Sequence, residues 1–202
     1  MGFGLPSIGG KDSMSGTFNE IDVPPTLVSF AVDVAKIQDV ITPELKKAGN
    51  KLVWLRAPRD QYDLPDYAGI MDQYEKLHND IQAGKVVSAY ALDRHGIAAA
   101  VSKMAFGNAL GVKIEHNLDP RDFFAPGFGD IIMEVPADKV GELSITYTLI
   151  GEVTDDGKFS YGNTVITEKE AEEAWKGTLE RVFKTASGED NEKQAKDEQI
   201  GR

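Results

Sequence analysis

The sequence predicts an α/β domain of the α+β kind, in which helices cover a mixed β-sheet. Apolar, β-branched segments alternate with segments of helical periodicity along most of the chain, which indicates strands connected through helices. Towards the carboxyl end, two predicted strands are separated only by a short turn, which favours an antiparallel part of the same sheet. The chain has 202 residues, of which 41% are hydrophobic and 27% charged, so it can bury a sizeable core without disulfides.

The first half of the chain carries the clearer strand and helix signals. Residues 26–35 follow two prolines and form an apolar, β-branched run, which predicts a strand buried on one face and partly on the other. Residues 67–83 place apolar side chains three or four residues apart and are followed by Gly84, which predicts a helix with a glycine C-cap. By the same criteria we expect strands at 51–57 and 86–92 and a helix of small residues at 97–106.

The second half is predicted to add four strands and two helices. Asp155, Asp156 and Gly157 form a turn that is expected to join a strand at 144–153 to one at 158–162 as a hairpin. Thr167 and Glu170 have the spacing of a capping box and therefore mark the start of a helix. The remaining segments are strands at 112–116 and 130–135, the latter as a central strand, and a short helix at 137–143.

These elements suggest three parts. Residues 1–16 are a Gly-rich ligand loop and entry segment, of the kind that usually follows a strand, so we expect a domain cut from a longer polypeptide. Residues 17–184 form the folded domain. Residues 185–202 contain no aromatic residue and no apolar periodicity, which predicts a disordered acidic tail or linker.

Charge and cysteine content exclude several classes of protein. With 22 basic and 33 acidic residues the net charge is −11, which argues against nucleic acid and against an anionic membrane surface as partners. Cysteine is absent, so disulfides, thiolate metal sites and thiol nucleophiles are excluded together. No apolar run approaches the roughly 20 residues of a membrane span, and we expect a soluble, cytoplasmic protein.

The densest candidate for chemistry is the segment Gly-Gly-Lys-Asp-Ser-Met-Ser-Gly at residues 9–16. Glycine backbone can approach a ligand closely and present N–H groups to phosphate oxygens. Lys11 suits phosphate neutralisation, Asp12 suits a hard cation, and the Ser13 and Ser15 hydroxyls can donate hydrogen bonds. The competing interpretation is a polar surface turn. A P-loop is excluded because the glycine and hydroxyl positions that it requires are absent.

Two other stretches merit comparison with that segment. Asp93 and His95 lie between a strand and a helix and could bind a metal or exchange a proton, but a capping aspartate beside an unrelated histidine is favoured. His78 and His116 are interpreted as a solvated helix residue and a loop residue. Residues 121–130 combine aromatic residues with Pro and Gly, typical of a loop packed by its Phe side chains or, alternatively, of a stacking wall for a ligand.

The Gly-Gly-Lys-Asp-Ser-Met-Ser segment, followed by the Pro-Pro-Thr-Leu-Val-Ser-Phe strand, resembles the second half of phosphoribosylformylglycinamidine synthase of the large type. The resemblance extends through Ser-Lys-Met-Ala-Phe-Gly-Asn at 102–108 and Phe-Gly-Asp-Ile at 128–131 and covers about residues 2–184. It implies the C-terminal domain of the second of two repeats of the aminoimidazole ribonucleotide synthetase type. In that family the domain has three layers with a mixed sheet.

The resemblance also implies a function. The family converts formylglycinamide ribonucleotide, glutamine and ATP into formylglycinamidine ribonucleotide, with Mg²⁺ as cofactor and ammonia delivered from a glutaminase domain. The chain would supply part of the ATP and substrate cleft, and its partners would be the first repeat, the glutaminase domain and a small phosphorylated substrate. We expect the chain alone to be inactive, because the remaining ATP and metal ligands lie elsewhere in such an enzyme.

Site residues transfer position by position. Shorter relatives read Gly-Gly-Asn-Val-Ser, so Gly10 would touch the nucleotide and Ser13 the substrate, while Lys11 replaces a metal-binding Asn and leaves Asp12 as the candidate Mg²⁺ ligand. No catalytic residue is assigned. Many members also carry a His-Asp-x-Ser-Asp-Gly-Gly-Leu loop that holds Mg²⁺-nucleotide at an auxiliary site; its His, Asp and Ser fall here on Tyr90, Ala91 and Asp93, a degenerate site.

Two functions therefore compete. The chain is either part of an ATP-dependent carbon–nitrogen ligase that contributes to its cleft, or a non-catalytic scaffold domain within that enzyme. The degenerate auxiliary site favours the scaffold on one face of the domain.

Overall fold

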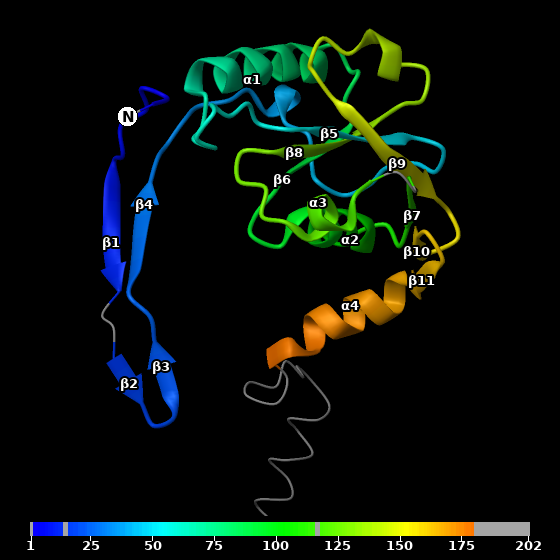
Figure 1. Cartoon of the computed structure of the whole chain (residues 1–202). Coiled ribbons are helices and arrows are strands. Elements are labelled where there is room, and N and C mark those ends of the chain that lie inside the picture. Colours follow the sequence, from blue (N-terminus) through cyan, green and yellow to red (C-terminus); the bar gives the residue numbers. More distant parts are fainter. Residues whose placement is uncertain (1, 14–15, 116–117, 180–202) are drawn as a thin grey trace, which may run out of the picture.

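The computed structural model describes residues 2–13, 16–115 and 118–179. Within these residues a seven-stranded mixed sheet lies between two layers of helices, which confirms the predicted α/β class (Figure 1). The order across the sheet is β11–β10–β7–β9–β5–β8–β6. The strand bounds are Lys51–Leu55 for β5, Ser88–Ala91 for β6, Gly111–Ile114 for β7, Ile131–Val135 for β8, Thr148–Thr154 for β9, Lys158–Tyr161 for β10 and Thr164–Thr167 for β11.

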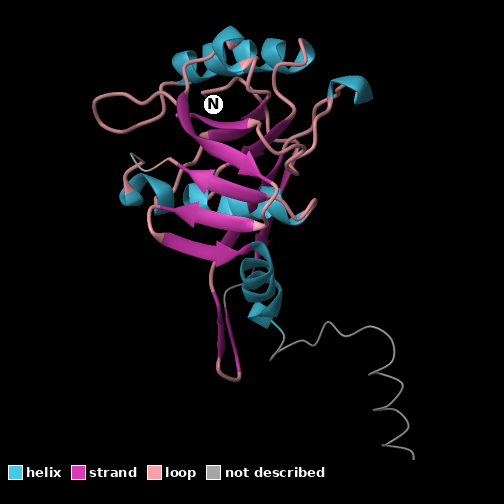
Figure 2. Ribbon diagram, turned by 90° about the vertical axis from the view of Figure 1, so that its right-hand side faces the viewer, coloured by secondary structure: helices cyan, strands magenta, loops and turns pink. Residues whose placement is uncertain are grey.

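Helices cover both faces of the sheet. Helix α1 covers one face, and α2 with the short α3 covers the other (Figure 1). The strands of the sheet lie beside one another across the molecule in the view turned by 90° (Figure 2). The helix bounds are Tyr67–Gln82 for α1, Gly96–Phe106 for α2, Pro120–Phe124 for α3 and Glu168–Lys176 for α4, with 3₁₀ turns at Ile37–Asp39, Val140–Glu142 and Gly177–Leu179.

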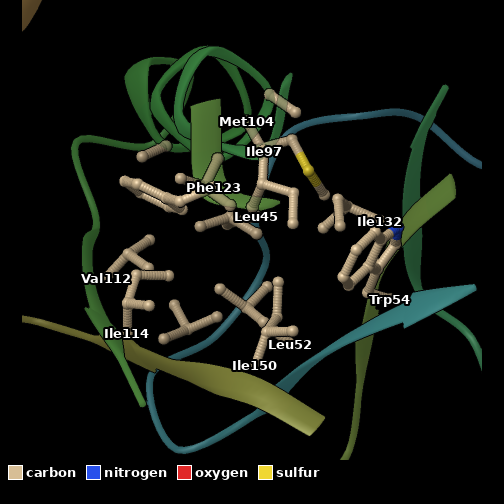
Figure 3. Packing of buried hydrophobic residues seen from close by; sticks show 14 of the residues in the cluster. Leu45, Leu52, Trp54, Ile97, Met104, Val112, Ile114, Phe123, Ile132 and Ile150 are labelled. Atoms are coloured by element: carbon tan, nitrogen blue, oxygen red, sulfur yellow. The ribbon is translucent and has the colours of Figure 1, made fainter. Parts of the chain in front are cut away.

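Strand β5 is buried on both faces because its neighbours and both helical layers enclose it. Leu52 and Trp54 pack into the cluster beneath α2 (Figure 3), whereas Val53 and Leu55 pack into the cluster beneath α1. Strand β8 divides its side chains in the same way, with Ile132 on the α2 side and Met133 on the α1 side. This double burial explains why both strands read as continuous apolar runs rather than as alternating ones.

Helices α1 and α4 follow their sequence signals closely. Asp66 caps α1 by accepting a hydrogen bond from the Gly69 amide, and Gly84 follows the helix with φ +70°. The predicted capping box is present in α4, where Thr167 and Glu170 satisfy each other's backbone amides. Helix α4 is held to α2 by stacking of Trp175 on Phe106, with ring centroids 5.5 Å apart.

The hairpin predicted around residues 155–157 is wrong. Strand β10 pairs in parallel with β7 and antiparallel with β11, and β7 separates it from β9. The turn after β9 crosses over the start of β7 at Gly111, where a Cβ atom would meet the side chains of Thr154 and Asp156 and lie 2.7 Å from the Lys158 carbonyl oxygen. The absence of a side chain at Gly111 therefore permits a crossing that strand periodicity does not reveal.

Three other element predictions need correction. Strand β8 lies next to the edge strand β6 rather than at the centre. The predicted helix at 137–143 is reduced to a 3₁₀ turn. Strand β9 begins four residues later than expected, because the amides of Ser144 and Thr146 donate instead to Asp80 (2.8 Å) and Gln73 (2.7 Å) on α1.

The amino-terminal segment forms a separate two-stranded ribbon. Strand β1 (Gly9–Ser13) pairs antiparallel with β4 (Thr26–Phe30), and β2 (Gly16–Phe18) pairs with β3 (Ile21–Val23) at its tip. The ribbon stands apart from the sheet (Figure 1), and Phe3 joins its base to α1 through an edge-on contact with Tyr67. The strand predicted at 26–35 is therefore shorter and more exposed than expected, with Leu27 84% exposed, because β1 is its sheet partner and no helix covers it.

Among the described residues no helix is long and apolar enough to cross a membrane. The tail predicted to be disordered at 185–202 lies outside the described residues.

A fully buried carboxylate holds the segment before β5 onto the sheet. Glu134 on β8 accepts hydrogen bonds from the amides of Lys46 (2.7 Å) and Lys47 (3.0 Å) and from the side chain of Asn50 (2.7 Å). A buried carboxylate costs free energy unless such donors compensate it. Glu134 thus fixes the residues that lead into the central strand.

We expect Glu134→Ala to lower the free energy of unfolding by about 3 kcal/mol, because it removes the acceptor of two partly buried amides and of the buried Asn50 side chain and opens a cavity. Urea denaturation followed by circular dichroism measures this change. Glu152→Ala serves as the matched control, since its ion pair with Lys51 is partly exposed and is expected to contribute less than about 1 kcal/mol. Equal effects of the two substitutions would contradict the proposed role of Glu134.

Candidate functional site

The first candidate site is the segment predicted to bind phosphate, and it is mainly a strand rather than a loop. Gly10 lies opposite Ser29 and Lys11 opposite Val28 in the β1–β4 ladder. Successive residues of a strand direct their backbone and side-chain groups to opposite sides. The amides of β1 therefore do not converge on one point as they do in a compact loop, and a ligand would meet one edge or one face of the ribbon.

Four of the five residues predicted to bind phosphate or metal lie on β1. Gly10 approaches β4 closely, because a Cβ atom there would lie 3.0 Å from the Val28 carbonyl oxygen. Lys11 is exposed. Asp12 and Ser13 are described as backbone of β1, and Ser15 lies outside the described residues. Binding of ATP or substrate by Gly10, Lys11, Asp12, Ser13 and Ser15 stays a prediction.

A second candidate site is a cavity of about 480 Å³ where β5 ends and β8 begins. Trp54 of β5 lines this cavity. The guanidinium carbon of Arg56 lies 4.1 Å from the centroid of the Trp54 ring. Nη2 of Arg56 lies 3.0 Å from a carboxylate oxygen of Asp122. Stacking on the indole ring fixes the plane of the guanidinium group.

The lining of this cavity carries a second guanidinium group. Arg59 donates hydrogen bonds to the carbonyl oxygens of Asp63 and Phe128, both at 3.1 Å, and so ties the segment after β5 to the loop before β8. That loop turns at Gly129, which has φ +89° and whose carbonyl accepts a hydrogen bond from Tyr74 at 2.6 Å. Helix α1 therefore helps to hold this part of the lining in place.

Asp130 contributes to the lining of the cavity from the start of β8. One of its oxygens accepts a hydrogen bond from the indole nitrogen of Trp54 and the other from the amide of Ala57, both at 2.9 Å. Burial raises the pKa of Asp130 above its ordinary value, although these hydrogen bonds and the nearby Arg56 and Arg59 oppose the shift. The carboxyl group thus braces the end of β5 against β8.

The degenerate auxiliary positions lie at the same end of the sheet. Ala91 ends β6, and Leu92, which lines the cavity, donates its amide to the Asp130 carbonyl at 2.9 Å. The Tyr90 hydroxyl lies 3.3 Å from the Lys103 ammonium group, so this position is occupied by a structural contact within the domain. In the Asp-Arg-His turn that follows, the Asp93 carboxylate accepts a hydrogen bond from the His95 amide (2.7 Å). This hydrogen bond lowers the pKa of the Asp93 carboxyl group.

The histidines and the aromatic loop have mostly structural placements. Both described histidines, His78 and His95, are exposed, and His116 lies outside the described residues. In the loop, Phe123 is buried and stacks on Tyr161 with centroids 5.2 Å apart, as expected for a packed loop. Phe128 is 63% exposed and lines the cavity, in keeping with the alternative interpretation as a ligand wall. Among the described residues no three His, Asp or Glu side chains are grouped to hold a metal ion.

Sequence analysis missed Arg56 and Arg59, which supply the positive charge of the cavity. Arg56 lies near the end of the predicted strand at 51–57 and Arg59 just beyond it, and ligand groups in open α/β sheets commonly lie at or beyond strand ends. Their location at a strand end is the feature of the sequence from which these two arginines could have been predicted. The partners across the cavity come from residues more than 60 positions later, which no local pattern indicates.

The raised pKa of Asp130 predicts a pH-dependent contribution to stability. The folded state binds the proton more tightly than the unfolded state, so the contribution of Asp130 falls as the pH rises above about 4 and through the raised pKa. We therefore expect the stability of the wild-type protein, minus that of Asp130→Asn, to decrease with rising pH in this range. Urea denaturation of both proteins between pH 3.5 and 7 measures this difference, and a pH-independent difference would contradict the prediction.

No protein-family model matches the sequence. The PurL subunit of phosphoribosylformylglycinamidine synthase from Methanobrevibacter smithii is 21% identical over 90% of this chain, which spans 30% of that relative's length. The PurL structure from Thermotoga maritima in complex with FGAR superposes with a TM-score of 0.55 at 12% identity, over 73% of this chain and 30% of that one. The complex with ATP gives the same TM-score at 13% identity, over 73% and 28%.

These likenesses agree with the residues that first indicated the family. The structural similarity establishes the fold, and the sequence similarity covers nearly the whole chain. The chain is thus similar, in sequence and in fold, to part of the PurL subunit of phosphoribosylformylglycinamidine synthase.

Proposed function

We propose that this chain is one domain of an ATP-dependent carbon–nitrogen ligase of purine biosynthesis. The whole enzyme would convert formylglycinamide ribonucleotide (FGAR), glutamine and ATP into formylglycinamidine ribonucleotide. The observation that carries the proposal is the match to PurL over 90% of the chain, joined with the Gly-Gly-Lys-Asp-Ser segment on a ribbon that stands clear of the core (Figure 1). FGAR and ATP are the ligands of the T. maritima PurL complexes, which supports both as ligands of the enzyme proposed here.

The groups on β1 fit the phosphates of such ligands. Lys11 supplies an exposed ammonium group, and glycine backbone at residue 10 allows close approach. In this proposal Gly10 and Lys11 contact nucleotide phosphate, and the Ser13 hydroxyl donates to the substrate phosphate, with Ser15 as a further donor. Bound ATP supplies the energy for replacing the amide oxygen by nitrogen, and the role of this chain is to orient phosphate groups and neutralise their charge.

Asp12 is the candidate ligand of Mg²⁺ in the same segment. Magnesium in nucleotide sites is commonly held by one or two carboxylates together with phosphate oxygens and water. A single aspartate next to a phosphate-binding lysine fits that donor set. The remaining ligands would come from ATP and from other domains of the enzyme.

The second candidate function is a non-catalytic scaffold within that enzyme. Its support is the structure at positions 90–93, where Tyr90 contacts Lys103 and Ala91 offers no carboxylate for a metal ion. On this view the domain packs against the first repeat and the glutaminase domain and leaves ligand binding to them. In either case we propose a cytoplasmic enzyme whose partners are its own further domains.

We expect the isolated chain to form no formylglycinamidine ribonucleotide from FGAR, ATP–Mg²⁺ and ammonia, because one domain supplies only part of the cleft. Product formation followed by mass spectrometry tests this expectation. Turnover by the purified chain, retained after a second chromatographic step, would show that the site is complete within these residues.

Ligand binding separates the two functions. We expect the chain to bind FGAR weakly in calorimetric titration, and Ser13→Ala to weaken that binding about tenfold, as expected for one lost charge-assisted hydrogen bond. Ser29→Ala is the control, because Ser29 is an exposed serine of the same ribbon and lies opposite Gly10 on the neighbouring strand. A wild-type chain that binds neither FGAR nor ATP–Mg²⁺ would favour the scaffold.

A further inference from the structure

We infer that the cavity at the end of β5 is a second anion-binding site, in which Arg56 and Arg59 bind the oxyanion of a small metabolite. The site is distinct from the phosphate-binding segment on β1, which lies on the ribbon and outside the seven-stranded sheet (Figure 1). The inference goes beyond the proposed function and does not depend on it. The ligand chemistry is a phosphate or carboxylate group with at least two acceptor oxygens.

Both guanidinium groups are held in place before a ligand arrives. Arg56 lies on the face of Trp54 (4.1 Å), and Trp54 is itself 6% exposed and fixed by its hydrogen bond to Asp130. Arg59 is fixed by carbonyl oxygens from two separate segments. Prior ordering of this kind removes part of the entropy cost of binding.

Each arginine retains donors for a ligand. A guanidinium group has five N–H donors in a planar fork that matches the two oxygens of a carboxylate or phosphate. Within the described residues, Arg56 directs one nitrogen at Asp122, and Arg59 directs two at carbonyl oxygens. The cavity that both arginines line has a volume of about 480 Å³, which lies in the range that small-molecule sites occupy.

The carboxylates around the cavity are weak competitors for these donors. The side chains of Asp122 and Asp63 are 44% and 87% exposed, and Asp63 lies 3.7 Å from Arg59, beyond hydrogen-bond distance. Exposed pairs of this kind contribute little, so a bidentate oxyanion can displace them into solvent. Asp130 also lines the cavity, but both of its oxygens already accept hydrogen bonds and burial raises its pKa.

The apolar part of the lining accommodates the body of the ligand. Phe128, Pro126, Leu92 and Trp54 all line the cavity. This combination of two arginines with aromatic and aliphatic surface suits a small organic anion better than a bare ion. A sugar phosphate or a carboxylate of similar size meets these requirements.

The test is titration of the full chain with inorganic phosphate, ribose 5-phosphate and citrate, monitored through tryptophan fluorescence. Trp54 reports from the cavity wall, and the background Trp175→Phe removes the signal of the other tryptophan. We expect saturable binding of at least one of these anions.

The double variant Arg56→Gln/Arg59→Gln is expected to weaken anion binding at least tenfold. The control variant Lys76→Gln/Lys139→Gln removes two surface charges elsewhere and is expected to leave anion binding unchanged. Tighter binding of ribose 5-phosphate than of citrate identifies a phosphorylated ligand, and the reverse identifies a carboxylate.

A second variant tests the direction of the effect without removing the arginines. Asp63→Asn/Asp122→Asn frees both guanidinium groups from their rim partners, so we expect anion binding to tighten about threefold or more. The variant Lys11→Gln/Ser13→Ala alters only the ribbon and is expected to leave the fluorescence titration unchanged. Failure of the wild-type chain to bind any of the anions, or unchanged binding after loss of both arginines, would overturn the inference. Loss of binding only in the ribbon variant would also overturn it, while leaving the proposed function of β1 supported.

Discussion

Two buried carboxylates on one face of β8 hold the centre of this domain together. Asp130 precedes the strand and Glu134 lies near its end, both on the face towards α2. Asp130 accepts hydrogen bonds from the Trp54 indole within β5 and from the Ala57 amide just after it. Glu134 accepts hydrogen bonds from backbone amides of the residues that precede β5. Each end of the doubly buried strand β5 is thus tied to its neighbour by a side chain as well as by the ladder. Because these hydrogen bonds form in a low dielectric, they are strong when made and costly when lost.

The same arrangement explains where the cavity lies. The segment after β5 carries Arg56 and Arg59, and the loop before β8 carries Phe128, so both walls depart from strands that Asp130 locks in register. Trp54 packs in the core cluster (Figure 3). It also lines the cavity, and Arg56 lies over its ring. A rigid core residue therefore forms part of the binding wall. Such a site needs little rearrangement to accept a ligand.

Local chemistry made much of the fold predictable from sequence. Helix α1 followed from its apolar spacing and Gly84, and the capping box located the start of α4 within one residue. Strand order was not predictable in this way, because the placement of β10 beside β7 depends on Gly111 allowing a turn to cross, a tertiary contact. The two candidate sites also differ in how far the sequence predicts them. The Gly-Gly-Lys-Asp-Ser segment is contiguous and could be identified by its residue types, whereas Arg56, Asp122 and Phe128 meet only in three dimensions.

The ribbon and the sheet domain differ in what stabilises them. Strands β1 and β4 form a two-stranded sheet, and an isolated pair of strands is marginally stable in water. Leu27, 84% exposed, and Ile8, 65% exposed, gain little from burial there, whereas the side chains of β5 are almost fully enclosed. Positional precision at Lys11 therefore cannot come from packing within the ribbon alone, and a ligand held there gains affinity only if something else orders β1. The cavity at the end of β5 already has this order, so the two sites should differ in entropy cost. Binding at the arginines proceeds on a formed surface, and binding at β1 includes the cost of fixing the ribbon.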